Sequence, residues 1–159
     1  MSAGAVLAIL AGFFFSALFS GVETGSYMIN RIRLRHRERQ RRPSALLLSR
    51  LLRNPHIFVF TVLIGNNIAI YVLSGVVTGL YLDGGLKEGR ILLGFIPWNA
   101  EMAATLTLMF PLFILAEAGP KNLFRKKPDI LMYRLAGTMR LLVLCFSPLT
   151  MMLDRLFSL

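Results

Sequence analysis

The chain has 159 residues, of which 55% are hydrophobic, and it carries a formal net charge of +10. Its mean hydropathy of +0.63 is well above that of a soluble domain of similar length, so the composition predicts one membrane domain and argues against a soluble fold. The single cysteine, Cys145, excludes both a disulfide framework and a thiolate metal site.

The first apolar stretch, residues 1–22, carries no charge and is long enough to cross the roughly 30 Å hydrocarbon core of a bilayer. A secretory signal is the alternative, but the stretch lacks a basic amino-terminal region and a convincing cleavage site. On a helix that continues past it, Ser16, Ser20 and Glu23 share one face. Because an ionisable group near bilayer depth is costly, Glu23 marks a candidate ion path. Small residues, which helix packing alone explains, form a neighbouring stripe: Ala17, Gly21 and Gly25.

Arginines dominate the connection at residues 31–53, where Glu38 is the only acidic residue. Nucleic-acid binding is one interpretation of such a run. Its position between two apolar stretches and its lack of interleaved aromatic residues favour topogenic charge and contact with anionic lipid headgroups. We therefore expect membrane lipids, and no nucleic acid, as partners here. The leucine-rich segment after Pro43 has the pattern of a short amphipathic helix on the membrane surface.

The second apolar stretch, residues 57–82, is also free of charge and predicts a second span. It contains Gly65 followed by two amide side chains, Asn66 and Asn67. Its polar residues at helical spacing form one face: Asn67, Tyr71, Ser74 and Thr78. Interhelical hydrogen bonds explain these groups as well as a ligand site does, so both interpretations stay open.

The third apolar stretch, residues 91–116, is interrupted near its start, where Trp98 fits an interfacial anchor. Glu117 follows, just before Gly119 and Pro120, where the loss of an amide donor should loosen the helix. A carboxylate beside freed carbonyls is the kind of cation site found in broken transporter helices. The alternative is an ion pair between Glu117 and Lys121, one helical turn on.

Two segments follow the basic residues 121–127. Residues 129–142 predict an amphipathic helix along the membrane, and the short, charge-free residues 141–153 predict an interfacial or re-entrant segment. Charges cancel in the connection after residue 82, so the positive bias is one-sided and places the amino terminus outside and the carboxyl terminus in the cytoplasm. The predicted fold class is an all-α membrane protein with three transmembrane helices plus cytoplasmic juxtamembrane amphipathic helices.

Carboxylate, amide and hydroxyl oxygens without a histidine or thiolate cluster suit hard cations: Mg²⁺, Ca²⁺, Mn²⁺ or Na⁺. His36 and His56 lie in the basic connection, too far from the spans to be ligands. The composition leaves the choice among these ions open. No nucleophile–base pair is evident, so we do not expect an enzyme.

Three signatures resemble the transmembrane domain of the CorC/cyclin M (CNNM) family. They are residues 19–24 (FSGVET) followed by 30–35 (NRIRLR), residues 63–67 (LIGNN) and residues 117–121 (EAGPK). The resemblance covers residues 1–159 as one transmembrane domain. Family members usually continue into a pair of cytoplasmic CBS modules that bind ATP. This chain stops at Leu159, which suggests a truncated or a naturally short member.

The resemblance implies a homodimeric Mg²⁺ transporter of the plasma (cell inner) membrane, with Na⁺ as a candidate coupling ion. A homodimer also fits the small-residue stripes, which include Gly75 and Gly79. The resemblance implies one dehydrated Mg²⁺ per protomer, held by side-chain and backbone oxygens. The implied metal residues are Ser20, Glu23, Asn66, Asn67, Ala116 and Glu117.

Three positions depart from the family pattern. Val22 stands where a second serine is frequent, Ile70 where a further asparagine is common, and Ala116 where the family has a glycine. Each lost oxygen weakens a site that must replace the hydration shell of Mg²⁺. Two functions therefore remain: a Mg²⁺ transporter, expected to be an exporter coupled to Na⁺, or a non-transporting membrane scaffold that keeps the fold with a degraded ion site.

Overall fold

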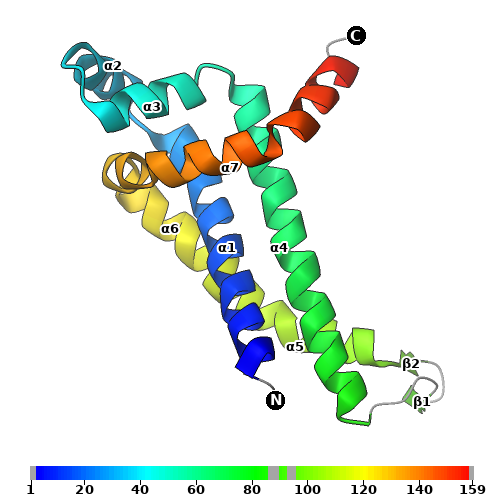
Figure 1. Ribbon diagram of the computed structural model, residues 1–159. Coiled ribbons are helices and arrows are strands. Elements are labelled where there is room, and N and C mark those ends of the chain that lie inside the picture. Colours follow the sequence, from blue (N-terminus) through cyan, green and yellow to red (C-terminus); the bar gives the residue numbers. More distant parts are fainter. Residues whose placement is uncertain (1–2, 86–89, 93–95, 158–159) are drawn as a thin grey trace.

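Three long apolar helices form the body of the molecule in the computed structural model, which describes residues 3–85, 90–92 and 96–157 (Figure 1). They are α1 (Ala3–Met28), α4 (Pro55–Asp83) and a third helical run, Ala100–Lys126. All three are long and apolar enough to cross a membrane. The predicted fold class, an all-α protein with three candidate spans, is therefore confirmed.

The third span differs from the expected residues 91–116 at both ends. Arg90–Leu92 (β1) and Ile96–Trp98 (β2) pair as a short antiparallel hairpin. These residues, where the helix was expected to begin, are therefore β-strands and not helix. The helix begins at Ala100 because the Asn99 side chain caps it, accepting a hydrogen bond from the amide of Met102 at 2.8 Å. Trp98 therefore belongs to the hairpin, and its side chain lies outside the described residues.

The carboxyl-terminal half of this span continues through Gly119 and Pro120 by changing its hydrogen bonding. After α5 (Ala100–Pro111), the π-helix η1 (Leu112–Ala118) leads directly into α6 (Gly119–Lys126). The Gly119 amide donates to the carbonyl of Ile114, five residues back. A Cβ at Gly119 would lie 2.8 Å from that oxygen, so a side chain there would crowd the π-turn. The predicted loosening before Pro120 thus takes the form of a π-helix, which frequently marks a functional site.

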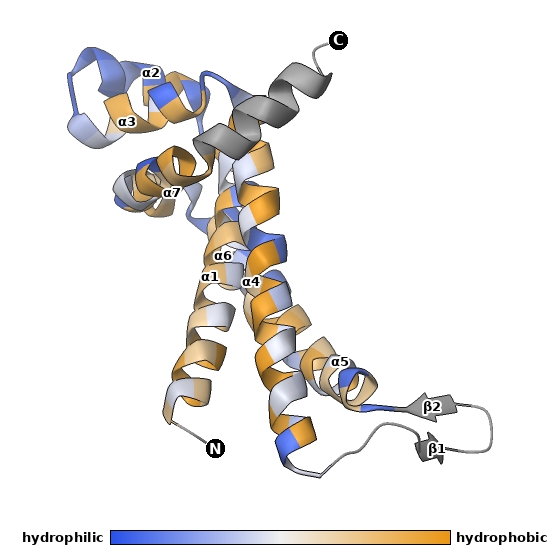
Figure 2. Cartoon of the chain, turned by 45° about the vertical axis from the view of Figure 1, so that its right-hand side comes forward, coloured by the Kyte–Doolittle hydropathy of each residue, from blue (hydrophilic) through white to orange (hydrophobic). Residues whose placement is uncertain are grey.

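Both basic connections lie at one end of the molecule (Figure 1). The first contains α2 (Arg31–Arg39) and α3 (Pro43–Leu51), and the second leads into α7 (Pro128–Phe157), which runs across the spans. Figure 2 shows the most hydrophilic residues over α2 and the turn before α3. The amphipathic helix expected after Pro43 is therefore confirmed as α3. The arginine run also forms a helix of its own, α2, which was not predicted from the sequence.

Helix α7 corrects the expectation of two separate carboxyl-terminal segments. Residues 129–142 and 141–153 form one continuous helix, with Pro148 inside it. Side chains beyond residue 146 lie outside the described residues.

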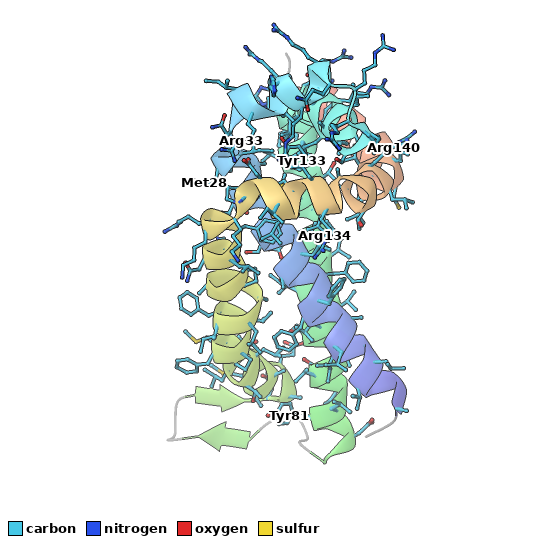
Figure 3. The ribbon with its side chains drawn as sticks, turned by 90° about the vertical axis from the view of Figure 1, so that its left-hand side faces the viewer. Met28, Arg33, Tyr81, Tyr133, Arg134 and Arg140 are labelled. Carbon is cyan, nitrogen blue, oxygen red and sulfur yellow. The ribbon has the colours of Figure 1, made fainter. Side chains whose placement is uncertain are left out.

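Asp129 and Tyr133, one turn apart on α7, hold α2 in place. Figure 3 labels Tyr133 on α7 and Arg33 on α2. Arg33 donates to the Asp129 carboxylate at 2.6 Å, and the Arg37 guanidinium lies 4.6 Å from the centroid of the Tyr133 ring. Burial raises the pKa of the Tyr133 hydroxyl above its usual range, and the nearby Arg37 opposes that shift. The basic helix α2 is therefore anchored to α7 by specific contacts.

The glycine stripe of α1 packs against the chain's own distant segments. A Cβ at Gly21 would clash with the ring of Phe124, and one at Gly25 would lie 2.7 Å from the sulfur of Met132. Gly75 and Gly79 on α4 have nothing within 4 Å of such a Cβ. The first stripe thus serves packing within the protomer, and only the second remains open to another molecule.

Candidate cation site

A cavity of about 100 Å³ lies where α1, α4 and η1 meet. Its lining contains Ser16, Ser20, Glu23, Asn66, Ile70, Leu112, Ala116, Glu117 and Lys121. Five of the six sequence-predicted metal residues therefore meet at one place, although they come from three different spans. Since one water occupies about 30 Å³ of the liquid, this volume suits a single ion with few waters.

Asn67 is the sixth predicted residue, and it lies apart from the other five. Its side chain is on an exposed face of α4 and donates a hydrogen bond to the backbone carbonyl of Leu63 at 2.9 Å. Adjacent residues of an α-helix point about 100° apart, so Asn66 and Asn67 cannot both face the cavity on a regular helix. Of the pair, Asn66 belongs to the site.

Helix α1 supplies three polar side chains one turn apart. The Ser16 hydroxyl donates to Asn66 Oδ1 at 2.8 Å, which joins α1 to α4 beside the cavity. The Ser20 hydroxyl is fully buried, and its oxygen has no hydrogen-bond partner in the described part of the chain. A buried hydroxyl without a partner is unfavourable unless a ligand or water completes it. The Ser20 hydroxyl is therefore available to a ligand or a water in this cavity.

The third span supplies Ala116, Glu117 and Lys121. Ala116 is buried, while the Glu117 carboxylate accepts a hydrogen bond from the Lys121 ammonium at 2.7 Å. Pro120 has no amide hydrogen, so neither the Leu115 nor the Ala116 carbonyl can receive a bond from that position. The ion pair and the cavity position, considered as alternatives for Glu117 from the sequence, thus occur together.

The cavity is chemically matched to a hard cation. Two carboxylates and one ammonium leave its lining with one net negative charge. Among the side chains that the structure describes, no three His, Cys, Asp or Glu residues gather in a way that could hold a metal. A cation here would therefore need hydroxyl, amide and backbone oxygens beside the carboxylates, which are the ligands that Mg²⁺, Ca²⁺ and Na⁺ accept.

Ser16 and Lys121 also line the cavity, although neither is among the metal residues predicted from the sequence. The signal for Ser16 was available, because Ser16, Ser20 and Glu23 share a helical face. Ile70 also lines the cavity, so this departure from the family pattern places an apolar side chain directly in the site.

Comparison with known proteins agrees with this architecture. Residues 6–159 match the family model of the cyclin M transmembrane N-terminal domain (CNNM). The chain is 34% identical over 142 residues to the UPF0053 inner membrane protein YfjD of Escherichia coli (strain K12), an alignment covering 87% of this chain. The chain spans 30% of the length of that relative. The match over nearly the whole sequence, to the transmembrane domain of this family, shows that the chain belongs to the CorC/CNNM family.

Proposed function

We propose that this membrane protein transports a divalent cation, with Mg²⁺ as the preferred substrate, and that it exports the ion in exchange for Na⁺. The observation that carries the proposal is the convergence of Ser20, Asn66 and Glu117 from three spans on one cavity, where the buried Ser20 hydroxyl has no partner among the described residues. Transport rather than catalysis fits a site built from ion ligands inside a membrane domain.

In this mechanism Glu23 and Glu117 provide the negative charge that offsets the dehydrated cation, and Ser20, Asn66 and the Ala116 carbonyl replace its water ligands. The π-helix η1 contributes because its backbone bonds can revert to α-helical spacing, which would shift Glu117 relative to α1 and α4. Such a shift would open the site alternately to the two sides of the membrane.

For the topology, we propose that the end bearing α2, α3 and α7 faces the cytoplasm and that the amino terminus lies outside. The proposal is supported by the arginines of α2 and its flanking turn, which form the hydrophilic region at that end in Figure 2, since cytoplasmic connections carry excess arginine and lysine. The relative's name, inner membrane protein, supports the plasma (cell inner) membrane as the location. The exposed arginines would contact anionic lipid headgroups.

We also propose a homodimer. Open space around Gly75 and Gly79 supports it, because small residues let a second helix approach closely within a membrane.

A non-transporting scaffold is the second candidate function. It is favoured by Ile70, an apolar side chain in the cavity lining at a position where the family commonly has an asparagine. It is also favoured by Lys121, whose ammonium already neutralises the charge of Glu117. The two candidates differ in one measurable property, the movement of ions.

The deciding experiment is flux from proteoliposomes. Wild-type protein is reconstituted with a Mg²⁺ indicator inside the vesicles, and Mg²⁺ movement is recorded with and without an opposing Na⁺ gradient. Empty vesicles give the leak, and Glu117→Gln is compared with Glu101→Gln, an exposed carboxylate at the start of α5 outside the cavity. Flux that is lost in Glu117→Gln and kept in Glu101→Gln supports transport. Flux equal to the leak in wild-type protein supports the scaffold.

A further inference from the structure

We propose that Lys121 is an internal counter-ion that occupies Glu117 whenever the site holds no cation, and that the incoming ion displaces it. This inference rests on the proposed transport function and names the group that regulates loading and release at the same site. The juxtaposition that carries it is the 2.7 Å contact between Lys121 Nζ and Glu117 Oε1, made by two residues that both line the cavity.

The pair is partly exposed, but it differs from other surface ion pairs because both residues line the cavity. Glu117 is the last residue but one of η1 and Lys121 lies on α6, so the pair joins the two sides of the π-helix junction. The Lys121 side chain is 36% exposed, which leaves its flexible stem room to swing away from the carboxylate. The ammonium can therefore leave and return without unfolding the helix.

The charges make joint occupancy unfavourable. A Mg²⁺ bound directly to Glu117 would lie about 2.1 Å from a carboxylate oxygen, within a few ångströms of the ammonium in its present position. Two positive centres at such a distance repel each other, and the repulsion grows with the charge of the ion. Loading would thus require Lys121 to move, and its return would favour release.

The ammonium also explains how the unloaded site can persist within a membrane domain. Without Lys121, Glu23 and Glu117 would form an uncompensated pair of carboxylates around a small cavity. With it, the lining carries one net negative charge instead of two. Lys121 therefore lowers the electrostatic penalty of the unloaded state and thereby weakens the affinity of the site for the cation.

The test is a cation titration of thermal stability on the full chain in mild detergent. Lys121→Met removes the charge and keeps an unbranched side chain, while Lys121→Gln provides a second neutral variant that retains polarity. Lys121→Arg retains the charge, and Lys126→Met is the matched control, because Lys126 is exposed at the end of α6 outside the cavity. Each variant is titrated with Mg²⁺ and, separately, with Na⁺.

We expect the neutral variants to bind Mg²⁺ on the order of tenfold more tightly than wild-type protein, with a smaller gain for Na⁺ because the repulsion scales with ionic charge. Lys121→Arg and Lys126→Met should keep the wild-type affinity. In proteoliposomes, the neutral variants should also release the ion more slowly at saturating Mg²⁺.

Two failures are distinguishable. Wild-type protein that neither cation stabilises would refute the proposed transport site and this role with it. Wild-type binding with unchanged or weaker Mg²⁺ affinity in both neutral variants would refute the counter-ion role alone and leave Lys121 as a structural partner of Glu117.

Discussion

Ser16 on α1 and Asn66 on α4 are joined by a hydrogen bond of 2.8 Å in which the serine hydroxyl donates to the amide oxygen. Ser16 is buried, and the two residues lie beside the buried hydroxyl of Ser20. The bond leaves the Asn66 oxygen one free lone pair, which can point into the cavity. It therefore orients a candidate ligand as well as joining two spans.

Replacing Ser16 with alanine should loosen this orientation with little damage to the fold. Interhelical hydrogen bonds in membranes contribute about 0.6 kcal/mol on average, so we expect a small decrease in the melting temperature. Affinity for Mg²⁺ should fall several-fold, because Asn66 becomes free to rotate. A Mg²⁺ titration of thermal stability measures both effects. Thr105→Ala is the control, since the Thr105 hydroxyl bonds within its own helix. Equal Mg²⁺ affinity in both variants would show that Ser16 is unnecessary for binding.

Glu117→Gln and Glu23→Gln should each abolish stabilisation by Mg²⁺ while the protein remains folded. Glutamine keeps the shape and one oxygen, but it removes the charge that offsets a divalent ion. An exposed ion pair one helical turn apart contributes only about 0.3–0.5 kcal/mol, so losing the Lys121 contact should not unfold the protein. A ligand at about 100 times its Kd stabilises by about 2.7 kcal/mol, which a melting curve resolves. Unchanged Mg²⁺ stabilisation in Glu117→Gln would mean that this carboxylate is structural.

Gly65→Ala should destabilise the protein, whereas Gly75→Ala should not. A Cβ at Gly65 would clash with the ring of Phe19, which is buried between α1 and α4. Overpacking of this kind typically costs about 1–3 kcal/mol. Gly75 has open space around it, and alanine also favours a helix more than glycine does. Melting temperatures in detergent test the contrast, and equal values would contradict the close packing of α1 on α4.

Gly75→Leu extends this comparison to the proposed dimer. The larger side chain should convert a dimer to a monomer in nanodiscs, whereas the small side chain of Gly75→Ala should leave the dimer intact. A monomeric mass for the wild-type protein under the same conditions would contradict the dimer itself.

Ile70→Asn should strengthen Mg²⁺ binding. Ile70 lines the cavity, so an asparagine there would add an amide oxygen to a site that has few neutral ligands. We expect an affinity gain of several-fold in the thermal titration, at the expense of some stability in the absence of the ion because an amide replaces an apolar side chain. Ile70→Val, which adds no oxygen, is the matched control. If both variants bind Mg²⁺ equally, position 70 does not contribute a ligand. Ile70 would then give no support to the scaffold function.

The sequence by itself was sufficient to predict the three spans, the amphipathic helix after Pro43 and the gathering of basic charge outside the apolar stretches. These are properties of single segments, because an apolar run or an arginine cluster has its effect regardless of what packs against it. Glu23, Asn66 and Glu117 could be identified as candidate ligands for the same reason, since polar groups within apolar runs are visible without knowing the fold.

The tertiary structure decided which of these groups meet. Asn66 and Asn67 differ by one residue, so the rotation of α4 about its axis determines which amide faces Ser16 and which turns away. Because residues 90–92 and 96–98 pair as a hairpin, the third span begins only at Ala100. The glycine stripe of α1 packs against Phe124 and Met132, which lie more than ninety residues away in the sequence. The rotation of α4, the pairing of β1 with β2 and the packing of the α1 glycines depend on contacts between different segments of the chain. A local pattern of residues therefore cannot predict them.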